Sequence, residues 1–224
     1  MTKNVQAPQG ATPLTAQAGT QAGIRPGSRS AIVRNLPSGH QADASALIVN
    51  LFGGPGVGKS TTAAEIFCLL KRAGVEAVAP EEHAKIALWS GQPHLLDNQI
   101  VLLGRTWETL TALARQVDVI ILDSPILLCS IYALRRESEN FHNLCDELHR
   151  RHRRINILLQ RNIRAKYTRN GRRESLDEAR DVDAMIRARL ERMEEDVLNI
   201  DADDTDAIAT IAKSIISGVK GDRS

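Results

Sequence analysis

Residues 46–60 read ALIVNLFGGPGVGKS, a mostly apolar run followed by a glycine-rich segment that ends in Lys59 and Ser60. A short apolar run that ends at glycines is typical of a strand buried in a parallel sheet. The glycine-rich segment fits the pattern G-x-x-x-x-G-K-[S/T], which cradles phosphates when it lies between a strand and a helix. Residues 60–73 carry apolar side chains at helical spacing and stop at Gly74. The sequence therefore predicts a phosphate-binding loop, or P-loop, in its required context.

Strands and helices are expected to alternate along the rest of the chain. The predicted strands are 75–79, 117–123, 155–160 and 197–200, and the predicted helices are 81–90, 106–116, 175–195 and 205–219. Ser175 and Glu178 form a capping box that opens the third of these helices. No regular element is assigned between residues 124 and 154. This alternation indicates an α/β fold with a three-layer parallel sheet, the P-loop NTPase architecture of nucleotide kinases.

The composition suits one globular domain with a tail: 224 residues, 42% hydrophobic and 25% charged. Residues 1–42 are dominated by small and polar residues without periodicity, so we expect an N-terminal arm that does not fold alone and a P-loop domain over 43–224. The arm carries four basic residues and no acid, a charge of +4, which leaves +2 − 4 = −2 for the remainder. A polyanion-binding arm and a solvated tail both fit this charge.

Cysteine usage and hydropathy bear on the compartment and the partners. Three widely spaced cysteines favour neither a disulfide framework nor a zinc cluster, which predicts a reducing cytoplasm, the host cytoplasm if the chain is phage-encoded. No apolar run reaches the roughly 18 residues of a membrane helix, so no membrane partner is expected. The aromatic content of 3% disfavours a platform that stacks bases.

The P-loop predicts ATP and Mg²⁺ as ligands. Backbone N–H groups of the loop and the following helix N-terminus would surround phosphate oxygens, and Lys59 would reach the β- and γ-phosphates. Ser60 is placed to hold Mg²⁺, and Asp123, at the end of the 117–123 strand, is the expected second metal contact. Asp123 as a turn cap is the alternative, because Asp-Ser-Pro starts turns well. The predicted ATP-binding residues are Gly53, Gly54, Pro55, Gly56, Val57, Gly58, Lys59, Ser60 and Thr61.

Three classes of P-loop protein have to be separated: motors, switches and kinases. A motor ATPase usually places Glu directly after the strand-end Asp, but here Ser124 follows. A switch GTPase should carry Asn-Lys-x-Asp, and that string is absent from the sequence. A small kinase needs an acceptor site and positive charge around the transferring phosphate. The residues therefore favour a kinase, with a P-loop ATPase or regulator that has no acceptor as an alternative.

A basic block provides the positive charge. Residues 149–173 contain ten Lys or Arg residues and no acid. Arg161 follows a predicted strand at the phosphate edge, and Arg172 lies beside Gly171, so both are predicted to neutralise the transferring group. For both, a solvated basic surface is the alternative. For Arg150, Arg151, Arg153 and Arg154 a solvated basic helix face is the preferred interpretation.

An acceptor hydroxyl needs a base or an orienting carboxylate. Glu81 and Glu82 follow the second predicted strand at the carboxyl edge of the sheet. Glu82 is therefore the predicted catalytic base. A surface capping pair is the alternative interpretation of these two residues.

Taken in order, several strings resemble a family of phage P-loop kinase-like proteins that is related to nicotinamide riboside kinase domains. The resemblance covers residues 46–200 and rests on Gly53 to Thr62, Glu82-His83-Ala84-Lys85 with Trp89, Gln99, Val119 to Leu128 with Asp123-Ser124-Pro125, and Leu159-Gln160-Arg161 with Tyr167, Gly171 and Arg172. His83 stands where the family pattern usually has Tyr, and the N-terminal arm is additional. The resemblance implies transfer of the ATP γ-phosphate to a hydroxyl of a nucleoside, nucleotide or nucleobase.

One branch of that family, in phages that hypermodify thymine, phosphorylates 5-hydroxymethyluracil within DNA. The resemblance to this branch implies DNA as a partner, and the basic arm and basic block would suit a polymer because basic side chains release counterions from phosphates. A soluble nucleoside or nucleotide kinase would need the same arginines, so that alternative stays open.

Overall fold

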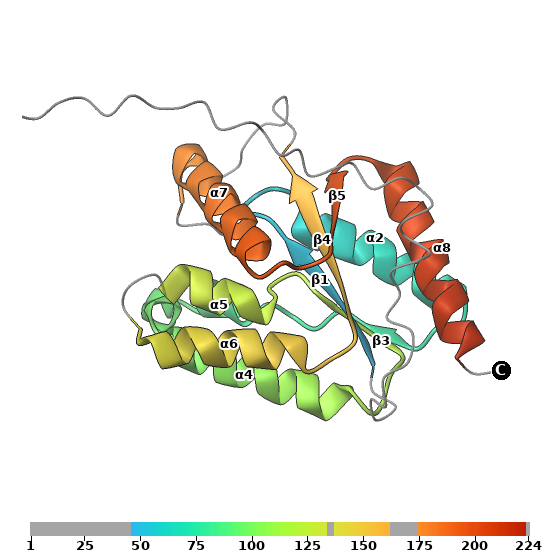
Figure 1. The fold of residues 1–224 in the computed structure, drawn as a ribbon, viewed down its shortest axis with the longest axis horizontal. Helices are drawn as coiled ribbons and strands as arrows, with labels where there is room; N and C mark the ends of the chain where they lie inside the picture. Colours follow the sequence, from blue (N-terminus) through green and yellow to red (C-terminus); the bar gives the residue numbers. More distant parts are fainter. Residues whose placement is uncertain (1–45, 134–136, 162–173, 223–224) are drawn as a thin grey trace, which may run out of the picture.

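The computed structural model describes residues 46–133, 137–161 and 174–222. Its centre is a parallel sheet of five strands in the order β2-β3-β1-β4-β5 (Figure 1). The strands are β1 (Leu47–Phe52), β2 (Ala77–Val78), β3 (Val119–Leu122), β4 (Arg154–Gln160) and β5 (Val197–Asp201). β1 pairs with β3 on one side and with β4 on the other, so the segment after β1 emerges between the carboxyl ends of both neighbours. Ligands bind at such a point in open α/β sheets.

Helices cover both faces of the sheet (Figure 1). One face carries α2 (Lys59–Arg72) and α8 (Thr205–Gly221), and the other carries α4 (Gln99–Leu113), α5 (Ile126–Ala133), α6 (Glu139–Arg150) and α7 (Leu176–Arg192). A short helix α3 (His83–Trp89) and a 3-10 turn (Pro93–Asp97) connect β2 to α4. The predicted α/β class with a three-layer parallel sheet is confirmed.

The side chains of β1 alternate between two apolar layers. Leu47, Val49 and Leu51 pack in the layer under α2 and α8, whereas Ile48 and Phe52 point to the opposite layer. All five are buried. A strand that is covered on both faces needs apolar residues at nearly every position, which explains the continuous apolar run in the sequence.

The helices differ from the predictions at three places. α4 begins at Gln99 rather than at 106, because the Asn98 side chain accepts a hydrogen bond from the Val101 N–H at 3.2 Å and caps the helix there. α5 and α6 fall where no element was assigned. α5 is apolar around its whole circumference and almost entirely buried, so it shows no amphipathic period.

Arg153 and Arg154 do not lie on a solvated helix face, which corrects that interpretation for these two residues. Arg150, the last residue of α6, and Arg151 after it have side chains that are 50% and 54% exposed, as a solvated face requires. Arg154 lies within β4 and donates two hydrogen bonds to Glu195, at 3.0 and 2.9 Å, and the Glu195 side chain is only 4% exposed. Asn156 donates a third hydrogen bond to the same carboxylate at 2.8 Å. Arg153 pairs with Asp222 at 2.8 Å. These residues fasten the amino end of β4 to the segments around it.

One prediction concerns a part of the chain that the structure does not describe. The arm over residues 1–42 lies outside the described residues, so its separation from the domain stays a prediction.

Within the described ranges, every helix is too short or too polar to cross a bilayer. Of the three cysteines, Cys129 and Cys145 are buried and Cys68 is exposed.

Candidate functional site

The predicted P-loop connects the end of β1 to the start of α2. Gly58 occupies the N-cap position of α2 with φ of +117°, a backbone conformation that L side chains rarely adopt. A Cβ there would also lie 3.0 Å from the Ala202 Cβ, so the loop that follows β5 packs against this glycine. The helix that begins at Lys59 directs its N-terminal N–H groups toward the carboxyl edge. The predicted ATP-binding residues 53–61 thus form the loop after β1 and the start of α2, at the carboxyl edge where β1 lies between β3 and β4.

Lys59 folds back over this loop. Its Nζ donates hydrogen bonds to the carbonyl oxygens of Gly53 at 2.7 Å and Gly54 at 3.1 Å. Burial lowers the pKa of the Lys59 ammonium, and three carboxylates oppose that shift. In order of effect they belong to Glu82, Asp123 and Asp183. Carboxylates from three separate segments therefore converge on one ammonium.

Ser60 and Asp123 lie together, as the metal prediction requires. The Ser60 hydroxyl donates to Asp123 Oδ2 at 2.8 Å, although the two residues are 63 positions apart in the chain. Mg²⁺ in nucleotide sites takes one or two protein oxygens together with substrate phosphates. A hydroxyl and a carboxylate beside a phosphate loop fit that donor set, so these two residues would hold the ion.

Glu82 lies next to this pair and does not cap a helix with its side chain. It occupies the N-cap position of α3 without a side-chain capping hydrogen bond. Burial raises the pKa of the Glu82 carboxyl, Asp123 raises it further, and Lys59 opposes the change. Glu82 lines a cavity of about 20 Å³ with Asp123 and Ser124. This carboxyl therefore faces the site.

His83, beside Glu82 in the same cavity, is fixed by α4. Its Nε2 lies 3.2 Å from the Thr109 hydroxyl oxygen, and that hydroxyl donates its hydrogen to the Arg105 carbonyl at 3.0 Å. Because the hydroxyl has only one hydrogen, His83 Nε2 must be the donor in this pair. The residue that departs from the family pattern thus ties α3 to α4.

Arg161 follows β4 and contacts the P-loop from the other side. Its Nη2 donates to the Pro55 carbonyl at 2.9 Å, and its Nε donates to Asp183 Oδ2 at 2.8 Å. Asp183, on α7, also accepts from the Gly54 N–H at 2.5 Å. Arg172 lies outside the described residues, so its role stays a prediction. Asp183 is the site residue that sequence reasoning missed, since it is one of thirteen acids between residues 174 and 206.

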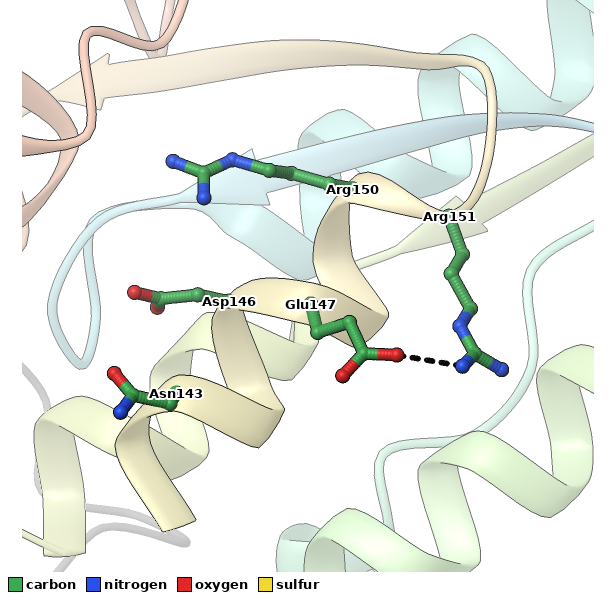
Figure 2. A pocket seen from close by; sticks show the side chains of 5 residues that line it. All are labelled: Asn143, Asp146, Glu147, Arg150 and Arg151. Atoms are coloured by element: carbon green, nitrogen blue, oxygen red, sulfur yellow. Dashed lines mark hydrogen bonds and ion pairs between the residues drawn. The ribbon is translucent and has the colours of Figure 1, made fainter. Parts of the chain in front are cut away.

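A larger hollow of about 540 Å³ lies along α6 and is lined by Asn143, Asp146, Glu147, Arg150 and Arg151 (Figure 2). Its charges are paired: Arg151 donates to Glu147 at 2.6 Å, and Asp146 pairs with Arg189 of α7. Arg150 and Arg151 stand before the amino end of β4, the edge of the sheet opposite the P-loop. This hollow is separate from the site at the carboxyl edge.

The fold and the site geometry define a P-loop NTPase of the α/β class. The family described as AAA domain matches residues 48–206, and the chain belongs to this family. The matched range contains the P-loop, Glu82, Asp123 and Arg161. The P-loop part of the resemblance drawn from the sequence is thereby confirmed.

Solved structures show more distant likenesses. Deoxyadenosine kinase from M. mycoides, with dCMP and dCDP bound, has a TM-score of 0.45 and 18% identity over 78% of this chain and 99% of its own. A gluconokinase from Sinorhizobium meliloti 1021 has a TM-score of 0.35 and 14% identity over 81% and 94%. The structure of APE1195 has a TM-score of 0.39 and 17% identity over 81% and 98%. No curated protein matches the chain. TM-scores this low assign no activity.

Proposed function

We propose that the chain is an ATP-dependent phosphotransferase that moves the γ-phosphate of ATP to a hydroxyl held beside Glu82. One observation carries this proposal: an ammonium, a hydroxyl–carboxylate pair and a carboxyl of raised pKa converge at the switch point of the sheet. These are the parts that phosphoryl transfer requires for binding, charge neutralisation and proton removal.

Each part has a separate task in the transfer. The loop N–H groups and Lys59 bind the β- and γ-phosphates. Ser60 and Asp123 hold Mg²⁺, which when bound neutralises charge on the phosphate oxygens. Glu82 accepts the proton of the acceptor hydroxyl while the oxygen of that hydroxyl bonds to the γ-phosphorus. The bond from that phosphorus to the β–γ bridging oxygen breaks, and ADP leaves.

Arginine adds positive charge to the same edge. We assign the neutralisation of the transferring group to Arg172. The Arg161 guanidinium lies at the same edge, but it is engaged by Asp183 and by the Pro55 carbonyl. Arginine suits this task because its planar fork matches phosphate oxygens and stays charged at all working pH values.

As the acceptor we propose the hydroxymethyl group of 5-hydroxymethyluracil in DNA. The resemblance to the thymine-hypermodifying branch supports it, as does the charge of +4 on residues 1–42. A free nucleoside or mononucleotide is the alternative acceptor.

The test is a transfer assay with γ-labelled ATP and Mg²⁺. Free nucleosides, mononucleotides, and duplex DNA with and without 5-hydroxymethyluracil are offered in parallel. We expect label on the modified duplex only, with loss of transfer in Glu82→Gln and unchanged transfer in Glu108→Gln. Glu108 is the matched control, because its carboxylate is exposed on α4.

Different failures separate the parts of the proposal. Label on nucleosides alone would move the acceptor to the soluble class. ATP hydrolysis that no acceptor alters would contradict the phosphotransferase and favour a P-loop ATPase without an acceptor.

A further inference from the structure

Helix α7 contacts the P-loop directly at Gly54. The Gly54 N–H donates to Asp183 Oδ1 at 2.5 Å. A Cβ on Gly54 would lie 2.5 Å from the Ala179 carbonyl oxygen and 2.7 Å from Asp183 Oδ1. Ala179 and Asp183 are four residues apart, so they lie on one face of α7. That face therefore rests on the loop backbone at a distance that only glycine permits.

Arg161 completes this contact from the end of β4. It donates to the other carboxylate oxygen of Asp183 at 2.8 Å and to the Pro55 carbonyl at 2.9 Å. Two consecutive loop residues are thus held through opposite backbone groups, an N–H and a carbonyl. The side chains of Arg161 and Asp183 are 14% and 24% exposed. We call these four residues, Gly54, Pro55, Arg161 and Asp183, the loop clamp.

The negative charge of Asp183 would weaken the binding of a triphosphate unless a positive charge neutralised it. A lone carboxylate beside the loop would repel the phosphates, but the Arg161 guanidinium neutralises it at hydrogen-bond distance. The Gly54 N–H donates its hydrogen bond to Asp183, so it does not donate to a phosphate oxygen. The clamp therefore holds the loop through the backbone groups of residues 54 and 55.

We infer that Asp183 is a positioning residue, which together with Arg161 holds residues 54 and 55 in the shape that receives the triphosphate. This inference rests on the proposed ATP site and adds a residue to which no role in that site has been assigned. Asp183 acts through the loop backbone. Loop amides bind phosphate well only when they are fixed beforehand in the receiving geometry, so a contact that fixes the loop backbone also sets the affinity.

The test compares Asp183→Asn with Asp181→Asn. Asp181 lies on the same helix and is exposed, so its substitution removes the same charge without touching the loop. Binding of N-methylanthraniloyl-ATP with Mg²⁺ is measured by fluorescence, and hydrogen–deuterium exchange is measured at the Gly54 amide. We expect Asp183→Asn to weaken binding about 10- to 100-fold and to speed Gly54 exchange at least about tenfold. Asp181→Asn should match the wild type in both.

Arg161→Gln removes the other charged side chain of the loop clamp, so the inference can still be tested if Asp183→Asn fails to fold. Because the clamp acts as a unit, the double variant should lose little more than either single variant. Asp183→Asn that binds within twofold of the wild type, or more tightly, with unchanged Gly54 exchange would overturn the inference. Equal weakening by Asp181→Asn would also overturn it, because helix charge would then be the cause. A wild type that binds no nucleotide while Asp183→Asn still loosens Gly54 would refute the proposed function and leave the clamp standing.

Discussion

Replacing Gly54 by Ala tests the packing of α7 on the P-loop with a single methyl group. The new Cβ would lie 2.5 Å from the Ala179 carbonyl oxygen, whereas ordinary contact begins at 3.4 Å, so loop and helix must separate by 3.4 − 2.5, roughly 0.9 Å. Such overpacking costs about 1–3 kcal/mol of unfolding free energy. That cost corresponds to a fall of about 2–12 °C in Tm for a chain of this size. If the loop binds ATP as proposed, we expect a displacement of this length to lower kcat/KM about 100-fold in the transfer assay.

Gly104→Ala is the matched control. Gly104 lies within α4 with no atom within 4 Å of its added Cβ. Alanine there should raise stability by about 0.5–1 kcal/mol, because glycine loses more backbone entropy in a helix. Thermal melts and Mg²⁺-ATP titrations of both variants give the comparison. A Gly54→Ala protein that melts and binds nucleotide like the wild type would refute the close packing.

Three further predictions concern titration and reactivity. Burial and Asp123 raise the pKa of Glu82 above the ordinary Glu value of 4.5. In a pH-rate series, the activity of the wild type should therefore begin to fall on acidification at a pH above 4.5. Glu82→Gln should lower kcat about 10²- to 10⁴-fold. Although burial opposes it, His149, whose Nε2 lies 3.4 Å from Glu195 Oε2, and the hydrogen-bonded Arg154 lower the pKa of Glu195 to about 2. The stability from that carboxylate is present above 4.5 and is lost as pH falls toward about 2, and urea melts of Glu195→Gln should lack this slope. Burial raises the pKa of the two buried cysteines to about 12, so mass spectrometry after iodoacetamide treatment of the native protein should find Cys68 alone modified; labelling of a buried thiol would contradict this.

The sequence was most informative where structure depends on neighbouring residues. The apolar run 46–52, the glycines after it and Lys59 specify a strand, a loop and a helix start without reference to the rest of the chain. Asp123 could be placed because it ends an apolar strand, and carboxyl ends of parallel strands share one edge. The hydrogen bond between Ser60 and Asp123 shows that this reasoning placed them correctly.

The sequence was least informative where side chains meet across the fold. α5 was missed because a helix that is buried on every side has no polar face to reveal its period. Asp183 could not be distinguished from the other acids of its segment, since its contact with Gly54 joins residues 129 positions apart.

Glu195 illustrates the same limit in the core. A carboxylate in a charged segment is expected to be solvated, yet its side chain is 4% exposed and accepts hydrogen bonds from Arg154 and Asn156. Buried charge is tolerated only when it is paired, and the pairing depends on β4 lying against the segment that precedes β5. Arg154 at the amino end of β4 thus pairs with a buried carboxylate, whereas Arg161, just past the carboxyl end, contacts the P-loop.

The central claim is that a triphosphate binds over residues 53–61 with Lys59 as its cation. Isothermal titration of the wild type and of Lys59→Ala with Mg²⁺-ATP tests it most directly. We predict saturable binding by the wild type and affinity about 100-fold weaker in Lys59→Ala, because the variant loses charge-assisted hydrogen bonds to phosphate. A wild type without affinity for ATP, or a Lys59→Ala variant that binds as tightly as the wild type, would contradict the claim.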